Sequence, residues 1–506
     1  MKLRLVHVTP LRSARARLLG ALCAASVFGL AGCSIGPDYV RPSVAVPAAF
    51  KENGGLSSTD SGALSTTADK AAVSSSPATP GWTHAAPADT ESRGAWWTRF
   101  NDPQLTALEA RVSVSNQTIQ KAVAQLQEAR AMVESAHAAY LPTVGVTTDA
   151  TSLHDSANVI GHQQTAGKSF GDYAVALDAS WEPDLWGRIA HENDAARAGA
   201  QASAADLESV RLGVHAELAV DYFNLRGLDA SKRLLDQTIT DYRQSLDLTK
   251  SRFAVGVSSQ ADVSQAETQL QVTEAQDIDL GVARAQYEHA IATLTGVPAS
   301  TFSLPPATAD FVPPAIPVGL PSELLQRRPD IAAAERRVAA ANDQIGIAQS
   351  AFFPDLVLSA TGGFESSTLT NWLTAPSRMW AVGPALVGTL FDGGRRRAMT
   401  EKAQAQYDAS AADYRETVLT AFQEVEDNLA SLRILREEAS KQNEAVASAQ
   451  KTLQLALDQY RIGTVDYLEV VTAQSTALTD ERTAVDLERR QIDASVLLVK
   501  ALGGVW

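Results

Sequence analysis

The stretch from Tyr140 to Arg188, YLPTVGVTTDATSLHDSANVIGHQQTAGKSFGDYAVALDASWEPDLWGR, has a different pattern from the sequence on either side of it. The flanking sequence is rich in Ala, Gln and Glu, which favour helix. Residues 172–182 instead alternate between large apolar side chains, among them Tyr173 and Leu177, and small or acidic ones. A period of two predicts a strand with one apolar and one polar face. Residues 143–153 alternate more weakly and are the expected partner strand.

Both segments have the length that a membrane-spanning strand requires. A tilted strand crosses a bilayer in about ten residues. Aromatic side chains stand at the ends of the segments, where a lipid–water interface would favour them: Tyr140, Tyr173, Trp181 and Trp186. A soluble hairpin that caps a helical bundle would alternate in the same way, because a single barrel strand carries a weak signal.

A similar stretch occurs a second time, at residues 353–394, FPDLVLSATGGFESSTLTNWLTAPSRMWAVGPALVGTLFDGG. We expect strands here at 355–365 and 378–391. Four short amphipathic strands in one chain are difficult to explain as accidental features of a helical protein.

The two stretches belong to a longer repeat. Phe253-Ala254-Val255-Gly256 and Tyr460-Arg461-Ile462-Gly463 lie 207 positions apart, as do several other matching pairs. The matching segments before the strands, Ala139-Tyr140-Leu141-Pro142 and Ala351-Phe352-Phe353-Pro354, lie 212 apart. The first copy therefore carries five more residues between its strands, where a surface loop tolerates insertion. Matching segments that keep nearly the same spacing through strand, turn and helix indicate internal duplication.

Residues 1–32 have the pattern of a targeting segment. Five basic residues precede an apolar run from Leu18 to Leu30 that is too short to cross a membrane as a helix. The run ends in Leu30-Ala31-Gly32-Cys33, which resembles the lipobox of bacterial lipoproteins, where the signal is cut before the cysteine and the cysteine is lipidated. We therefore expect lipidation at Cys33; the alternative is an ordinary cleaved signal with an incidental cysteine. In the same resemblance, Ser34 favours sorting to the outer membrane.

Cleavage at this point would change the cysteine count and the charge. Cys23 would be lost, so Cys33 would be the only cysteine of the mature chain, without a disulfide partner or a cysteine-based metal site. The segment holds five positive charges and no acidic residue, so the formal net charge would change from −15 to −20. This acidity argues against binding to nucleic acid.

Composition divides the rest of the chain into four parts. Residues 33–95 form a low-complexity tether of Ala, Ser, Thr, Pro and Gly, which cannot bury enough apolar surface to fold alone. Residues 96–297 are the first structural repeat. Residues 298–321 are a proline-rich connector in which helix cannot persist. Residues 322–506 are the second repeat.

Long helices occupy most of both repeats. We expect helix over 104–139 (begun by Asp102 as N-cap and Pro103), 188–253 and 262–295 in the first copy. The second copy opens with the segment 322–331, which is followed by helix to about residue 351 and by helices over 394–460 and 467–502. The helix over 188–253 would be roughly 100 Å long. Helices of this length with narrow apolar stripes need neighbours along their whole length, as in coiled coils.

Geometry also limits how the strands can close. Four strands cannot form a closed barrel, and an open sheet edge in hydrocarbon would leave backbone groups without hydrogen bonds. If the strands cross a membrane, several chains must contribute to one barrel.

Several motifs together identify a family. They are Cys33, Trp96-Trp97 with Phe100 and Asp102-Pro103, Asp184-Leu185-Trp186-Gly187-Arg188, Arg327-Arg328-Pro329-Asp330-Ile331 and Phe391-Asp392-Gly393-Gly394. With the duplicated halves, they resemble the TolC/OprM-type outer membrane efflux proteins, and among these the NodT-type lipoproteins of resistance–nodulation–division pumps. The resemblance implies a mainly α-helical homotrimer, in which a twelve-stranded transmembrane barrel continues as a long periplasmic helical barrel. It also implies a periplasmic adaptor and an inner-membrane pump as partners, outer membrane lipid around the barrel, and neither nucleic acid, cofactor nor metal.

The resemblance further implies two sites. The turns at Val255, Gly256 and Val257 and at Ile462, Gly463 and Thr464 match the family's adaptor-contacting tips. Asp262 and Glu469 occupy equivalent positions and match the family's acidic aperture, to which Tyr460 would add a hydrogen-bonding layer. Three chains would bring six carboxylates to one narrowing, which would attract cations and repel anions. Thr472 departs from the family pattern, because some relatives have an acidic residue there. The alternatives are ordinary turns and solvated carboxylates.

We therefore predict passive conduction of drugs or other small solutes through a trimeric tunnel gated at its periplasmic end. There are three alternatives. An enzyme is disfavoured because the chain lacks G-x-S-x-G, H-E-x-x-H and P-loop motifs. The outer membrane exporter of a type I secretion system would share the fold. A lipid-anchored periplasmic coiled coil would not explain the four repeated strands.

Overall fold

The computed structural model describes residues 35–52, 94–158, 166–306, 314, 316 and 321–504. The expected signal at 1–32, Cys33 and most of the tether lie outside these residues. The chain forms two compact units, and each is described by itself. The first comprises residues up to 41, 127–201 and 335–412, and the second comprises 42–126, 202–334 and the chain from 413 onward.

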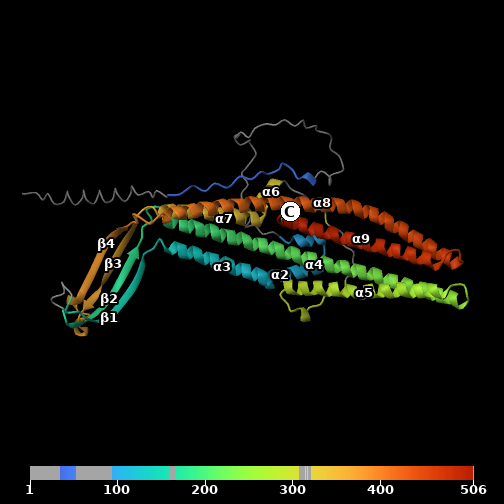
Figure 1. Ribbon diagram of the computed structural model, residues 1–506, viewed down its shortest axis with the longest axis horizontal. Helices are drawn as coiled ribbons and strands as arrows, with labels where there is room; N and C mark the ends of the chain where they lie inside the picture. Colours follow the sequence, from blue (N-terminus) through green and yellow to red (C-terminus); the bar gives the residue numbers. More distant parts are fainter. Residues whose placement is uncertain are drawn as a thin grey trace, which may run out of the picture. The chain divides into compact units, whose positions relative to one another are not determined.

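The first unit contains an antiparallel sheet of four strands in the order β1-β2-β3-β4 (Figure 1). The strands are β1 (Thr143–His154), β2 (Ser169–Trp181), β3 (Asp355–Ser366) and β4 (Arg378–Val387). All four expected strands are therefore present. The sheet joins the two copies of the repeat through the β2–β3 pair, in which Leu177 lies opposite Gly362.

One face of this sheet is apolar and exposed. Val146, Leu177 and Trp380 lie in one row across the strands, because Val146 pairs with Leu177, and Gly362, opposite Leu177, pairs with Trp380. Trp380 is 77% exposed and Leu177 is 61% exposed. The opposite face carries Asp178, which accepts hydrogen bonds from Thr147 (2.7 Å) and Thr361 (2.8 Å) on the adjacent strands. The sheet thus has the one apolar and one polar face that the alternation predicts.

The prediction of a strand to residue 391 was wrong. β4 ends at Val387, which pairs with Asp355, the first residue of β3. Pro354 precedes Asp355 and has no N–H to extend the ladder. The other strand limits differ from the expected ones by at most three residues, the largest difference being the start of β2 at Ser169.

An extended N-terminal segment lies against the helices of the first unit. The amide of Ile35 donates to the carbonyl of Trp186 (3.1 Å), and Asn342 donates to the carbonyl of Pro37 (2.8 Å). The Tyr39 hydroxyl donates to the carboxylate of Glu335 (2.6 Å), which is almost fully buried. This end of the tether is therefore held by specific contacts.

Helices make up the rest of the structure. In chain order they are the 3-10 helix η2 (Trp96–Phe100), then α2 (Pro103–Ser115), α3 (Gln117–Ala138), α4 (Arg188–Ala254), α5 (Gln260–Leu294), α6 (Pro321–Arg327), α7 (Pro329–Ser350), α8 (Arg395–Ile462) and α9 (Tyr467–Ala501), with short 3-10 turns η3 (Ala299–Thr301), η4 (Leu369–Asn371) and η5 (Ala375–Ser377). Among the described residues, no helix combines the length and apolarity of a membrane span.

α4 and α5 form one antiparallel hairpin, and α8 and α9 form another (Figure 1). Ion pairs join the helices of the first hairpin, for example Lys232 with Asp277 (2.8 Å) and Arg243 with Glu274 (2.6 Å). The expectation of a single helix over 188–253 is confirmed, since α4 runs through Gly213 and Gly227 without a break. A Cβ at Gly227 would lie 2.9 Å from Cδ of Arg489, so a glycine makes room for that side chain of α9.

The prediction of one helix over 104–139 was wrong. The chain is extended at Asn116, with ψ at 124°. The Asn116 side chain accepts from the amide of Ile119 (3.0 Å), which caps α3, and donates to the carbonyl of Leu294 (2.8 Å). In the second copy, a break between α6 and α7 occurs at Arg328, which donates to the carbonyl of Ala501 (3.1 Å).

The core of the second unit lies where η2 and α2 pack on the middle of α4 and the ends of α5 and α9. It includes Trp96, Leu105, Val112, Leu218, Phe223, Ile291 and Val496, all buried. Asp102 begins α2 as predicted: its carboxylate accepts from the amides of Gln104 (2.8 Å) and Leu105 (3.0 Å).

Candidate functional site

The α4–α5 and α8–α9 turns have the same backbone structure. In the first turn, the amide of Val257 donates to the carbonyl of Arg252 and that of Gly256 to the carbonyl of Phe253, both at 2.9 Å. In the second, Thr464 donates to Gln459 (3.0 Å) and Gly463 donates to Tyr460 (3.0 Å). Both patterns are Schellman motifs, in which a left-handed residue ends a helix and satisfies its last carbonyls.

Glycine occupies the left-handed position in each motif. Gly256 has φ of +79° and Gly463 has φ of +89°, values that cost other residues free energy. The structure places Ile462 in the last turn of α8 and not in the loop, because the chain leaves the helix only at Gly463. All six predicted tip residues nevertheless lie at or next to the two turns.

The tips of the hairpins expose apolar side chains. Val255 is 74% exposed and Ile462 is 78% exposed, and Val257 is also open to solvent. The sequence interpretation missed two further members of this surface, Phe253 and Leu468, which are exposed as well. Their signal was available, since each is a large apolar residue beside a predicted turn. Exposed apolar side chains gathered at two equivalent turns are typical of a protein-binding surface.

The two predicted aperture carboxylates are equivalent in position but not in bonding. Asp262 accepts from the amide of Ser259 (2.8 Å), and Ser259 Oγ accepts from the amide of Asp262 (3.1 Å). This capping box gives Asp262 a structural role at the start of α5. Glu469 is exposed at the matching position of α9, where no side chain caps the helix. Thr472 is also exposed, and its hydroxyl donates to the carbonyl of Leu468 (2.9 Å).

Tyr460 lies between the two hairpins and is only 3% exposed. Its hydroxyl lies 3.0 Å from Ser258 Oγ and donates to Thr249 Oγ1 (3.3 Å), so its hydrogen bonds are made within the chain. Its ring meets that of Tyr467 edge-on at 5.3 Å. The guanidinium of Arg252 lies over the Tyr460 ring, 4.6 Å from its centre.

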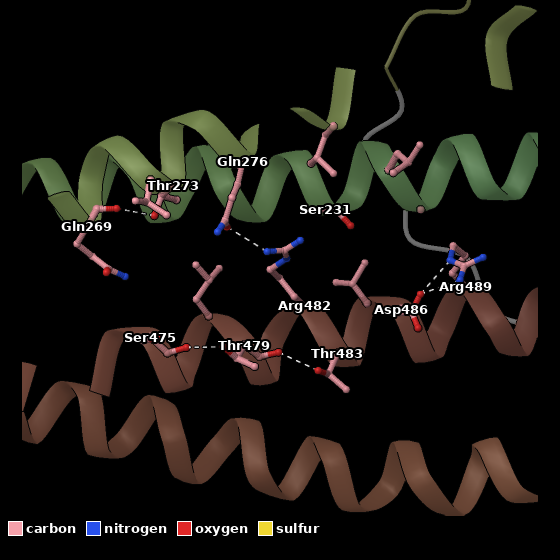
Figure 2. A pocket seen from close by; sticks show the side chains of 16 residues that line it. Ser231, Gln269, Thr273, Gln276, Ser475, Thr479, Arg482, Thr483, Asp486 and Arg489 are labelled. Atoms are coloured by element: carbon pink, nitrogen blue, oxygen red, sulfur yellow. Dashed lines mark hydrogen bonds and ion pairs between the residues drawn. The ribbon is translucent and has the colours of Figure 1, made fainter. Parts of the chain in front are cut away.

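Tyr460 and Tyr467 belong to an apolar cluster that the two hairpins share. The cluster also includes Tyr242, Leu246, Val263, Leu270, Ala456 and Val470. A cavity of about 600 Å³ lies between α4, α5 and α9, and Figure 2 shows the side chain of Arg482 crossing it. Arg482 donates to the amide oxygen of Gln276 (3.0 Å).

A buried serine, histidine and glutamate in the second unit bear on possible enzyme activity. Nδ1 of His215 lies 2.5 Å from Oε2 of Glu109, and Nε2 lies 3.4 Å from Oγ of Ser113. This connectivity resembles that of a Ser–His–acid triad, which requires an ionised acid and a serine that gives its proton to the histidine. Here burial raises the pKa of Glu109 to about 9 and lowers that of His215 to about 4. The carboxyl therefore keeps its proton and donates it to Nδ1.

The hydrogen bonds of Ser113 also differ from those of a catalytic serine. Ser113 Oγ donates to the carbonyl of Glu109 (3.2 Å), so that it accepts from Nε2 of His215. The His215 ring stacks on Trp97, with the ring centres 4.6 Å apart. These contacts describe a neutral, structural hydrogen-bonded chain. Among the described residues, no group of three or more His, Cys, Asp or Glu side chains is placed to hold a metal ion.

Known proteins resemble the chain over almost its whole length. The sequence model of the family described as outer membrane efflux protein matches it twice, at residues 107–297 and 320–504. The probable efflux pump outer membrane protein TtgC of Pseudomonas putida is 31% identical over 487 residues, which cover 96% of this chain and 95% of the relative. The cation efflux system protein CusC of Escherichia coli O6:H1 is 29% identical, covering 94% and 96%. The solved structure of the outer-membrane channel OprN superposes with a TM-score of 0.81 at 28% identity, covering 94% of this chain and all of that one.

Proposed function

The chain belongs to the outer membrane efflux protein family, and we propose from this premise that it is the passive outer membrane conduit of a tripartite pump for drugs or other small solutes. The double match to the family carries the proposal, because each matched half contains two strands and one helical hairpin. The sequence relatives quoted above are efflux proteins, and TtgC is an outer membrane protein by name. The outer membrane is therefore the location of this chain.

We propose that three chains close one twelve-stranded barrel. The exposed apolar face of the sheet supports this, since side chains such as Trp380 and Val382 would contact lipid. β1 and β4 are the edges of the sheet, and strands from sister chains would supply their missing hydrogen bonds. The long helices of the two hairpins would continue the barrel as a helical tube.

The partners follow from the hairpin tips. The apolar residues Val255, Val257 and Ile462 would contact a periplasmic adaptor, which would join the channel to an inner-membrane pump of the resistance–nodulation–division class. A pump that supplies the energy explains why the chain itself needs no nucleotide-binding motif.

A lipid anchor is the third part of the proposal. Residues 1–32 would be removed as a signal and Cys33 would be acylated. The contact between Ile35 and Trp186 supports this arrangement, because it holds the chain two residues after Cys33 at the junction of β2 and α4. Several acyl chains on one cysteine would give stable anchoring, at about 0.8 kcal/mol for each buried CH₂.

Asp262 and Glu469 are proposed to form the acidic aperture. The test is the conductance and ion preference of purified protein in planar lipid bilayers. Asp262→Asn combined with Glu469→Gln removes both charges, and Asn can still accept from the amide of Ser259, so the cap of α5 is kept. We expect cation preference to fall by about threefold, because six fixed charges at one narrowing concentrate cations there.

Asp279→Asn is the matched control, since this exposed carboxylate lies farther along α5. An aperture variant whose traces match those of the wild type and the control would remove the gate assignment. Wild-type protein that stays monomeric, is not heat-modifiable and opens no channel would contradict the conduit itself.

A further inference from the structure

The charged side chains of the four strands are divided between the two faces of the sheet. Strand side chains alternate between faces, so the pairing of the strands assigns each residue to one of them. Arg378, the first residue of β4, pairs with Phe364 of β3, which pairs with Val175 of β2. Val175 lies two residues from Leu177, so Arg378 belongs to the apolar face. Within the described strands, the acidic residues belong to the polar face together with Asp178: Asp149, Asp172, Asp355 and Glu365.

Arg378 stands at one end of an apolar row along β4. The other residues on this face of the strand are all exposed: Trp380, Val382, Pro384 and Leu386. At about 3.4 Å per residue and a tilt of about 40°, the row accounts for roughly 20 Å of the roughly 25 Å lipid-facing band of a membrane barrel. Arg378 is exposed as well, and a long basic side chain at the edge of such a band reaches the headgroup layer.

The chain order shows which edge of the band this is. β1 follows α3 and β2 leads into α4, and β3 and β4 are joined to α7 and α8 in the same way. The β1–β2 and β3–β4 connections therefore lie at the strand ends away from the helices. In the proposed channel the helices extend into the periplasm, so these connections face the cell exterior. Arg378 would then lie level with the headgroups of the outer leaflet.

The β3–β4 connection adds aromatic and apolar side chains beside Arg378. Its Trp372 lies against Tyr173, with the ring centres 6.4 Å apart, and the strand alternation places Tyr173 on the apolar face. Leu369 and Leu373, which precede and follow Trp372, are both largely exposed. Aromatic and apolar side chains next to an exposed arginine are typical of a lipid–water interface.

A cavity of about 440 Å³ lies at this end of the sheet, and Arg378 is the one basic residue among its described lining residues. Ser366 also lines it, and its Oγ accepts from the amide of Thr368 (3.2 Å), which leaves the hydroxyl proton for a further bond. Asp172 and Glu365 line the part that belongs to the polar face. These carboxylates would repel a free anion inside the cavity. A lipid phosphate would instead be held beside Arg378 by its own acyl chains on the apolar face.

We propose that Arg378 binds the phosphate of a phosphorylated lipid in the outer leaflet of the outer membrane. The guanidinium would donate two parallel hydrogen bonds to the phosphate, and Ser366 would donate a third. The acyl chains would lie along Trp380 and Val382, and each chain of the trimer would hold one such lipid. This inference rests on the proposed function and adds to it the class of lipid that the barrel selects.

Native mass spectrometry of the purified trimer tests the contact, with lipid A, a phosphorylated glycolipid, and enzymatically dephosphorylated lipid A as the two probes. The wild type should bind the phosphorylated form about tenfold more tightly, because a guanidinium–phosphate pair combines charge with two hydrogen bonds. Arg378→Gln should lose this preference. Arg378→Lys should keep part of it, since it retains the charge without the planar fork. Inorganic phosphate at the same concentration should not displace the lipid.

Arg490→Gln is the matched control, because it removes an exposed arginine of α9 by the same substitution and should bind both probes as the wild type does. An equal preference in the wild type and in Arg378→Gln would overturn the inference, as would displacement of the lipid by inorganic phosphate. If Arg378→Gln does not assemble, Arg378→Lys decides: a reduced preference supports the contact and an unchanged one overturns it. A wild-type trimer that prefers the phosphorylated lipid but opens no channel in bilayers would contradict the proposed conduit alone.

Discussion

Glu109 shows how burial determines what a side chain can do. Its carboxyl is fully buried, contacts His215 at 2.5 Å and leaves Oε1 without a hydrogen-bond partner. An ionised carboxylate would be costly here, so the group stays neutral and the histidine stays neutral beside it. The same three residue types that could form a nucleophilic site in a solvated cleft therefore form part of the core.

This protonation state predicts the pH dependence of stability. The pKa of Glu109 is about 9 in the folded chain and near 4.5 when unfolded, so its stabilising contribution is complete below pH 4.5 and is lost as the pH rises toward 9. Glu109→Gln keeps a donor to His215 Nδ1 without a titrating proton. Relative to this variant, the wild type should lose on the order of 1 kcal/mol per pH unit between pH 5 and 8.

Thermal unfolding followed by circular dichroism at pH 5, 6.5 and 8 provides the measurement. His215, whose pKa falls to about 4, contributes a loss of stability as the pH drops below 6.5. That loss is common to both proteins and cancels in the difference. Parallel curves for wild type and Glu109→Gln would mean that the carboxyl is ionised in the fold.

At the level of helices and strands, the duplication explains both what could be predicted and what could not. Period-two alternation around Tyr173 and the 207-residue spacing were enough to locate four strands and two equivalent turns, because the alternation is local and the repeat can be read by comparing the sequence with itself. The capping box at Ser259 and Asp262 was also local, and its S-x-x-D pattern could have been identified. The contact of Arg252 with Tyr460 could not, since it joins residues more than 200 positions apart.

The break at Asn116 was missed because helical periodicity continues through this position and it is neither Gly nor Pro. The break at Arg328 has a sequence signal, since Pro329 follows it and disfavours helix at the preceding residue. Each break is maintained by a bond to the end of a distant helix: Asn116 to Leu294 and Arg328 to Ala501. The two donors lie 212 positions apart and the two acceptors 207 apart, the same spacings as in the sequence repeat. Two different residue types thus keep one contact in both copies.

Replacement of Asn116 tests whether this break depends on its side chain. Asn116→Ala removes the cap of α3 and the bond to Leu294, and should cost about 1–2 kcal/mol. Asn116→Ser can still cap α3 and should cost less, because only the bond to Leu294 is lost. Lys121→Ala, on an exposed position of α3, is the control. Equal thermal midpoints for Asn116→Ala and Lys121→Ala would show that the backbone breaks here without help from the side chain.

At the scale of the whole molecule, the proposed trimer depends on which face of the sheet meets lipid. Val382 and Ala381 are adjacent in β4 and point to opposite faces, because strand side chains alternate. Val382 pairs with Ala360, on the same face as Leu177 and Trp380. A lysine at position 382 would enter hydrocarbon at a cost of about 2–4 kcal/mol near the midplane. A lysine at 381 would face the water-filled interior of the proposed barrel.

We therefore expect Val382→Lys to lower the amount of heat-modifiable trimer recovered from outer membranes, and Ala381→Lys to leave it near the wild-type amount. Three lipid-facing lysines in one trimer multiply the cost, so the difference between the variants should be at least tenfold. The measurement is the trimer band of unheated membrane samples, with total chain determined after heating. Because the two positions are adjacent in one strand and both receive a lysine, the added charge is matched. Equal trimer from both variants would mean that the apolar face of this sheet does not contact lipid.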